Sequence, residues 1–192
     1  MSKGTPGNEF SHLVQVDRIG PEGTDLHLVA NPAEREALAR RFRIPAVLSL
    51  SADLRVFPDP VLAGHYRLTG QLAAEVEQTC VVSLDPVRQQ VAESFQRLFA
   101  PPEVVEKAAA VQTDDDEEAE WLDPDADDPP DPLVNGGIDA GAVVAEALAL
   151  ALDPYPRKPG AGLPEGYRPD DDGGAKVSPF AVLAKLKTGK ND

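Results

Sequence analysis

The sequence of 192 residues contains a single cysteine, one tryptophan, one methionine and few aromatic residues of any kind. One cysteine excludes an internal disulfide and a zinc site built from several cysteines. The first ten residues, MSKGTPGNEF, lack the apolar core that a signal peptide needs. No apolar run reaches the roughly 18–20 residues that cross a bilayer. We therefore expect a cytoplasmic protein that does not enter a membrane.

The short motifs that accompany several enzymatic chemistries are also missing. The chain has no glycine-rich phosphate loop, no H-E-x-x-H, no G-x-S-x-G and no Cys/His grouping. The EF-hand spacing, with its central glycine and final glutamate, does not occur either. The sequence therefore predicts no catalytic residue, no metal ligand, no cofactor and no small-molecule substrate. A hydrolase, or a nuclease that holds magnesium between carboxylates, is the less favoured alternative.

Negative charge is present in excess and is unevenly spread over the chain. The formal net charge is −15. Residues 1–110 carry 11 Lys and Arg against 14 Asp and Glu, whereas residues 111–192 carry 7 against 19. The segment 114–131 alone holds 11 acidic residues and no basic one. Such a run repels itself and is expected to be flexible, and an acidic chain is a poor general binder of phosphate backbones.

Alternation of apolar and polar residues predicts the centre of the fold. It runs over residues 65–83 and returns over residues 87–99, after the turn Leu84-Asp-Pro86. This pattern predicts a long β-hairpin whose first strand bends near Gly70. Shorter strands are expected at residues 12–19, at residues 25–30 and within residues 44–57.

Capping signals predict the helices. Asn31 is a good N-cap, Pro32 falls at the first helical position and Glu34 falls at the third, so a helix is expected over residues 32–42. Asp139 caps a second helix over residues 140–152, which has a broad apolar face. A short third helix is expected over residues 178–187.

Together these elements predict an α+β fold. It is a twisted, mostly antiparallel β-sheet with two or three covering helices and a long acidic disordered loop. A single domain is expected to comprise residues 1–111 and 135–160, interrupted by an acidic flexible excursion at 112–134. A flexible linker at 161–177 and a short amphipathic helix with a tail at 178–192 should follow.

Cys80 shares the apolar phase of the first hairpin strand, where a thiol packs as a small hydrophobic side chain. A catalytic thiol needs an accessible, electropositive setting that lowers its pKa, and the neighbours Thr79 and Val81 supply none. We therefore predict a buried strand residue, and we expect the substitution Cys80→Ser to leave function intact.

Three segments carry a family resemblance: GQLAAEVEQTCVVSLDPV (70–87), IDAGAVVAEALALALDPYPR (138–157) and SPFAVLAKLK (178–187). With NPAEREALARRF (31–42), the chain resembles alphaproteobacterial members of the bacterial YceD family, the large ribosomal RNA subunit accumulation proteins. The resemblance implies a non-enzymatic role in large-subunit ribosomal RNA accumulation or processing and in ribosome biogenesis. Many members carry C-x-x-C at the hairpin and further cysteines near the C-terminus, a spacing that suggests zinc. Here Ser83 takes the second position, so a zinc-binding role is not carried over.

The resemblance implies a ribosomal RNA precursor or a large-subunit ribosomal protein as the partner. Arginine meets phosphate bidentately, so the candidate RNA contact is a group at the end of the first predicted helix. Its members are Arg35, Arg40, Arg41 and Arg43. The alternative for these residues is a solvated helix face on which they pair with Glu34 and Glu36.

The acidic run supports a second reading, in which the chain is an acidic protein-interaction module or a chaperone for a basic ribosomal protein. The alternative for this run is a solubilising linker. Partner docking is expected at a few apolar and basic residues: Trp121, Phe180, Leu183, Lys185 and Lys187. Packing onto the protein's own domain is the alternative for these side chains. A membrane- or stress-linked interaction protein is disfavoured, because the surface is negative.

Overall fold

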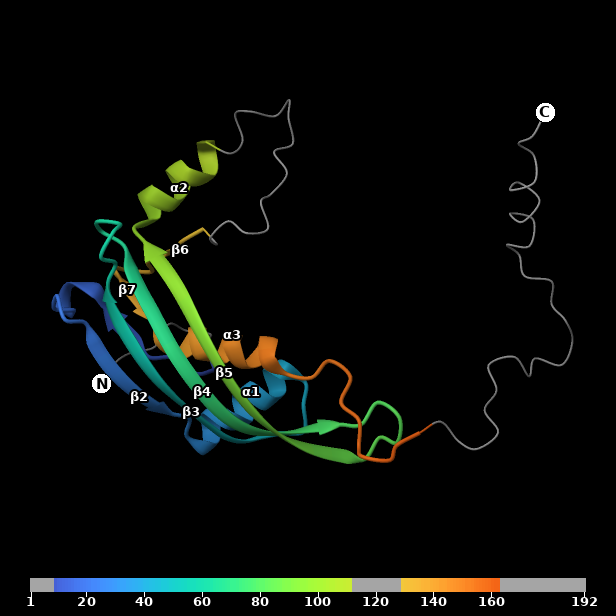
Figure 1. Ribbon diagram of the computed structural model, residues 1–192. Coiled ribbons are helices and arrows are strands. Elements are labelled where there is room, and N and C mark those ends of the chain that lie inside the picture. Colours follow the sequence, from blue (N-terminus) through green and yellow to red (C-terminus); the bar gives the residue numbers. More distant parts are fainter. Residues whose placement is uncertain (1–8, 112–128, 163–192) are drawn as a thin grey trace, which may run out of the picture. The chain divides into compact units, whose positions relative to one another are not determined.

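A computed structural model of the chain describes residues 9–111 and 129–162 (Figure 1). The chain divides into two compact units, Met1–Lys158 and Pro159–Asp192, and every element named below lies in the first. That unit is a curved β-sheet with helices α1 (Pro32–Phe42) and α3 (Ala140–Ala151) packed against the same side (Figure 1). The predicted α+β class is confirmed. None of the helices in the described residues is long and apolar enough to cross a membrane.

The main sheet has five strands in the order β2-β3-β4-β5-β6. Neighbouring strands are antiparallel, except that β6 pairs in parallel with the end of β5. The strands are β2 (Thr24–Val29), β3 (Ala46–Pro58), β4 (Tyr66–Thr79), β5 (Pro86–Ala100) and β6 (Asp131–Pro132). The predicted hairpin, now β4 and β5, lies within this sheet as expected.

A second, two-stranded sheet joins β1 (Leu13–Gln15) to β7 (Gly137–Asp139) in antiparallel register. The strand predicted over residues 12–19 is therefore too long, because a 3-10 turn over Val16–Arg18 follows β1. Strands β6 and β7 were not predicted at all. They have two and three residues, too few for a periodic pattern, and long-range pairing creates them.

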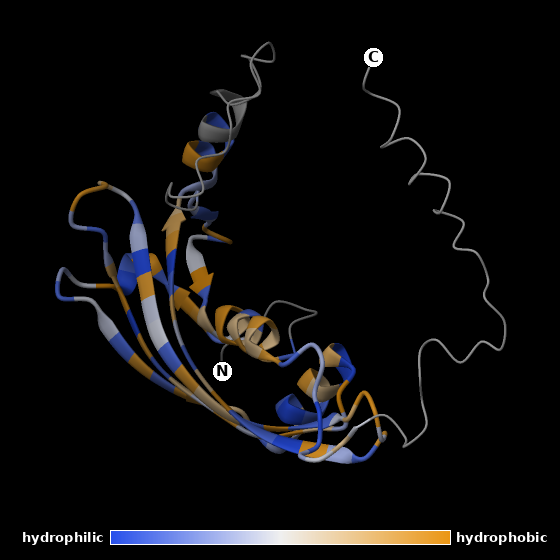
Figure 2. Ribbon diagram, turned by 45° about the vertical axis from the view of Figure 1, so that its right-hand side comes forward, coloured by the Kyte–Doolittle hydropathy of each residue, from blue (hydrophilic) through white to orange (hydrophobic). Residues whose placement is uncertain are grey.

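One face of the sheet is buried and holds the core. Apolar and polar residues alternate along the strands (Figure 2), and the buried apolar residues form one core cluster with those of α1 and α3. Among the largest fully buried side chains are Leu50, Val56, Leu68 and Val76 on the strands and Leu38, Val144 and Leu148 on the helices. Gly70 has no side chain, and Leu54 and Phe95 fill the space that a Cβ would occupy there.

The capping predictions are confirmed in atomic detail. Asn31 Oδ1 accepts hydrogen bonds from the amides of Ala33 and Glu34, at 3.0 and 3.1 Å, while Glu34 Oε2 accepts one from the Asn31 amide at 2.8 Å. Asp139 Oδ1 accepts from the amide of Ala142 at 3.2 Å and caps α3. A further helix, α2 (Pro102–Val111), directly follows β5. The predicted helix at 178–187 and most of the acidic excursion lie outside the described residues.

Candidate functional site: the hairpin turn and the segment after α3

The connection between β4 and β5, residues 80–85, forms a closed turn. The Cys80 amide donates to the Asp85 carbonyl at 2.8 Å, and the Leu84 amide donates to the Cys80 carbonyl at 3.0 Å. Leu84 has a φ of 62°, in the left-handed region that leucine seldom adopts. These bonds end β4 at Thr79, so the strand predicted to run to residue 83 is too long.

The segment that follows α3 binds to this turn and to β4, where Gln78 Nε2 donates to the Asp153 carbonyl at 2.9 Å. The Val81 amide donates to the Pro156 carbonyl at 2.9 Å. Lys158 Nζ lies 3.0 Å from Asp85 Oδ2, with which it forms an ion pair. Two of the three segments that carry the family resemblance, 70–87 and 138–157, therefore meet at this end of the hairpin. We call the turn 80–85 and the segment 153–158 together the hairpin-end site.

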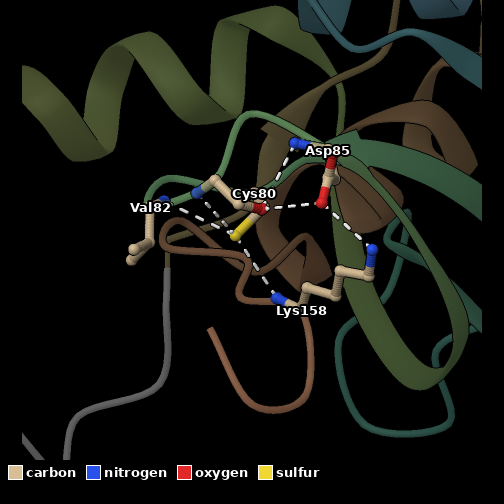
Figure 3. Close-up of polar contacts among 5 residues, drawn as sticks. Cys80, Val82, Asp85 and Lys158 are labelled. Atoms are coloured by element: carbon tan, nitrogen blue, oxygen red, sulfur yellow. Dashed lines mark hydrogen bonds and ion pairs between the residues drawn. The ribbon is translucent and has the colours of Figure 1, made fainter. Parts of the chain in front are cut away.

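Cys80 lies at the centre of the hairpin-end site (Figure 3). Its Sγ accepts hydrogen bonds from the amides of Val82 at 3.5 Å, Ser83 at 3.4 Å and Lys158 at 3.4 Å. The Lys158 amide contributes most and Ser83 next, and together these donors lower the pKa of the Cys80 thiol to about 6. The side chain is 0 % exposed. The predicted burial is confirmed, but Cys80 directly follows the last residue of β4 and does not lie on a strand. The donors to its sulfur are Val82, Ser83 and Lys158, and neither Thr79 nor Val81 is among them.

The residues around Cys80 do not fit a zinc site. Ser83, which stands at the second position of the C-x-x-C pattern, donates its hydroxyl to Asp85 Oδ2 at 3.2 Å. The Lys158 ammonium also binds this carboxylate. No three His, Cys, Asp or Glu side chains gather closely enough to hold a metal ion anywhere in residues 9–111 and 129–162. The sulfur instead binds backbone amides, and it joins the hairpin to a segment 78 residues later in the chain.

Three of the four arginines in the candidate RNA contact bind other groups of the protein. Arg35 Nη1 donates to the Leu48 carbonyl at 2.7 Å, which ties α1 to β3. Two others form ion pairs, Arg40 with Glu36 at 2.7 Å and Arg41 with Glu9 at 3.0 Å. Arg43 ends α1 with a φ of 57° and is exposed, and its side chain bonds to no other described residue. RNA contact through these arginines stays a prediction.

The residues predicted to dock a partner, Trp121, Phe180, Leu183, Lys185 and Lys187, lie outside the described residues. Sequence reasoning missed three exposed apolar side chains at the hairpin-end site. Val81 is 47 % exposed, Leu84 75 % and Tyr155 70 %. The sequence held a signal for two of them. Leu84 directly precedes Asp85-Pro86 and Tyr155 directly follows Asp153-Pro154, so each is an apolar residue inside a turn segment.

A pH-dependent difference in stability is expected between the wild type and Cys80→Ala. A folded-state pKa near 6, below the ordinary value of 9.0, makes the thiolate stabilising above pH 9, and this stabilisation is lost as the pH falls through 6. The melting temperature of the wild type should therefore exceed that of Cys80→Ala most at pH 9, and the difference should shrink toward pH 6. Circular dichroism melts at several pH values measure it. A difference that does not change with pH would contradict the assignment of a thiolate.

A family model described as "Large ribosomal RNA subunit accumulation protein YceD" matches residues 68–187. No curated protein and no solved structure gives a significant match. The matched range contains β4 from Leu68 onward, the turn 80–85, β5, α3 and the segment 153–158, and so the whole hairpin-end site. Because the match covers more than half of the sequence, the chain belongs to the YceD family.

Proposed function

We propose that this protein is a non-enzymatic, cytoplasmic factor that acts by binding in the accumulation of large-subunit ribosomal RNA. The description of its family names the process. The direct partner in this proposal is a precursor of that RNA or a large-subunit ribosomal protein. The observation that supports binding is the hairpin-end site. Val81 and Leu84 on the turn and Tyr155 on the segment 153–158 are exposed there, and long-range bonds join the turn to the segment.

Leu84 illustrates why this surface suits a partner. Its left-handed backbone conformation is strained for a residue with a branched side chain, and the side chain is left 75 % exposed. The fold itself gains little apolar burial from leucine at this position. An apolar side chain held outward on a rigid turn gains burial when a partner covers it, as do central anchors at protein interfaces.

The low pKa of Cys80 is compatible with a non-enzymatic binding role. A thiol with a pKa of about 6 has the ionisation of a nucleophile. However, three amides bind its sulfur and the side chain is 0 % exposed, so no substrate reaches it in this conformation. A low pKa caused by structural hydrogen bonds favours a thiolate that stabilises the site.

The proposal is tested by depleting the protein from cells that encode it and measuring the ratio of large- to small-subunit ribosomal RNA. Depletion should lower the ratio, and the wild-type gene should restore it. Leu84→Asp should fail to restore it, because the apolar anchor is lost while aspartate tolerates the left-handed conformation. Val61→Asp, at a site 85 % exposed in another loop, is the matched control and should restore the ratio. An unchanged ratio after depletion would refute the proposal.

A further inference from the structure

Among the described residues, strand β5 has a free edge over most of its length. One edge pairs with β4 from Pro86 to Phe99. On the other edge β6 pairs only with Phe99 and Ala100. No other strand in the described part of the chain pairs with that edge of β5. A free strand edge presents unpaired backbone donors and acceptors, which is the chemistry that an added strand needs.

The register shows which backbone groups face outward. The bond from the Cys80 amide to the Asp85 carbonyl marks that pair as hydrogen-bonded, and such pairs alternate along an antiparallel ladder. Even-numbered residues of β5 therefore direct both N–H and C=O away from β4. Two facts agree with this assignment: Pro86 has no N–H to direct, and the Ala100 carbonyl accepts from the amide of Leu133 at 2.8 Å. The outward-facing positions in the free part are Arg88, Gln90, Ala92, Ser94 and Gln96.

Helix α3 runs beside this edge and forms a groove with it. Gln89 Nε2 lies 3.4 Å from Asp153 Oδ2, just after the helix, and Arg97 Nη2 lies 3.9 Å from Glu146 Oε2 within it. Figure 1 shows β5 as the outermost long strand, with α3 next to it. A cavity of about 410 Å³ lies between them, lined by β5 residues 89–93 together with Ala151 and Asp153.

The chemistry of the groove favours a basic peptide. Its lining includes the carboxylates of Glu93 and Asp153 and no Lys or Arg. Asp153 accepts hydrogen bonds from Gln89 and from the Tyr155 amide, and neither donor carries a charge. Glu93 is exposed and forms no ion pair with another described residue. Val91, 9 % exposed, adds an apolar floor, so side chains of both kinds are accommodated.

We propose that the free edge of β5 and the C-terminal end of α3 bind an extended, Lys/Arg-containing segment of a partner protein as an additional β-strand. Backbone hydrogen bonds to the even-numbered residues hold the segment, and Glu93 and Asp153 select for positive charge. A strand edge requires a polypeptide backbone, which excludes RNA as the occupant. This inference goes beyond the proposed ribosomal role and does not depend on it.

The test uses the full chain and a short fluorescein-labelled peptide of alternating lysine and valine, with binding followed by anisotropy at about 0.15 M salt. A second peptide carries N-methyl groups on alternate residues, which keep the charge and remove strand pairing. We expect N-methylation to weaken binding by about tenfold or more. The variant Ala92→Pro, which removes one outward N–H, should weaken binding of the first peptide to a similar extent.

Charge variants separate the effect of the groove on peptide binding from the effect of the protein's overall charge. Glu93→Lys should weaken binding about tenfold, whereas Glu22→Lys makes the same change in net charge elsewhere and should alter it less than about twofold. Equal binding of both peptides would overturn the proposal, and this comparison needs no variant that might misfold. Equal effects of the two charge variants would overturn it as well. A third result would also overturn the proposal: the wild type sediments as a dimer that does not bind the peptide, and Ala92→Pro dissociates this dimer. A second copy of the chain would then occupy the edge.

Discussion

Replacing Leu148 by alanine is expected to lower the free energy of unfolding by about 3 kcal/mol, within the range of about 2–5 kcal/mol found for buried leucines. Leu148 is 0 % exposed and lies on the face of α3 that packs against the sheet. The substitution removes apolar contacts and leaves a cavity between the helix and the sheet. Urea denaturation followed by circular dichroism measures the change.

Leu150→Ala is the matched control for this prediction. The residue lies in the same helix and undergoes the same chemical change, but it is 80 % exposed. Its effect should stay within about 0.5 kcal/mol. Equal losses for the two variants would show that α3 does not pack on the sheet through the face described above. Because α3 leads directly into the segment 153–158, Leu148→Ala should also reduce rescue in the depletion experiment.

Gly141→Ala is expected to destabilise the protein by about 2 kcal/mol, although alanine is the better helix former by about 1 kcal/mol. A Cβ at this position would lie 2.8 Å from the His12 amide nitrogen and from the Phe10 carbonyl oxygen, and 2.9 Å from Ser11 Cα. These are backbone atoms that cannot rotate away. The Ala140 amide, which donates to the His12 carbonyl at 2.9 Å, holds this segment against the start of α3.

Gly20→Ala is the control for Gly141→Ala. Nothing lies within 4 Å of a Cβ built at Gly20, and its φ is not in the left-handed region. Alanine there should leave the free energy of unfolding unchanged or raise it by up to about 1 kcal/mol, because it restricts the unfolded chain. If Gly141→Ala instead raised the midpoint of denaturation, the close approach of residues 10–12 to α3 would be wrong.

The sequence predicts those parts of the fold that local chemistry determines. Alternation of apolar and polar residues locates the β4–β5 hairpin, because one face of each strand is buried. The Asn31 and Asp139 caps locate α1 and α3, because each satisfies amides within its own helix turn. Each of these signals depends on residues close to one another in the chain.

Parts that depend on distant residues escaped prediction. The amide of Lys158, which contributes most to the low pKa of Cys80, comes from a segment 78 residues away. The bond from Arg35 to the Leu48 carbonyl was not predicted, because it forms only when α1 packs on β3. The free edge of β5 follows from the strand order, which no periodic pattern specifies. Tertiary pairing, rather than local propensity, determines all three.

A crosslinked pull-down from native lysate most directly tests whether this chain acts by binding in large-subunit ribosomal RNA accumulation. The experiment is done with and without nuclease, and both RNA and protein are identified. We predict enrichment of large-subunit RNA precursor or of a large-subunit ribosomal protein, and less of it with Leu84→Asp than with Val61→Asp. Enrichment that nuclease abolishes and Arg43→Glu reduces would assign the contact to RNA, and enrichment that persists would assign it to protein. If neither ribosomal RNA nor ribosomal protein exceeds the background, the proposed function is contradicted.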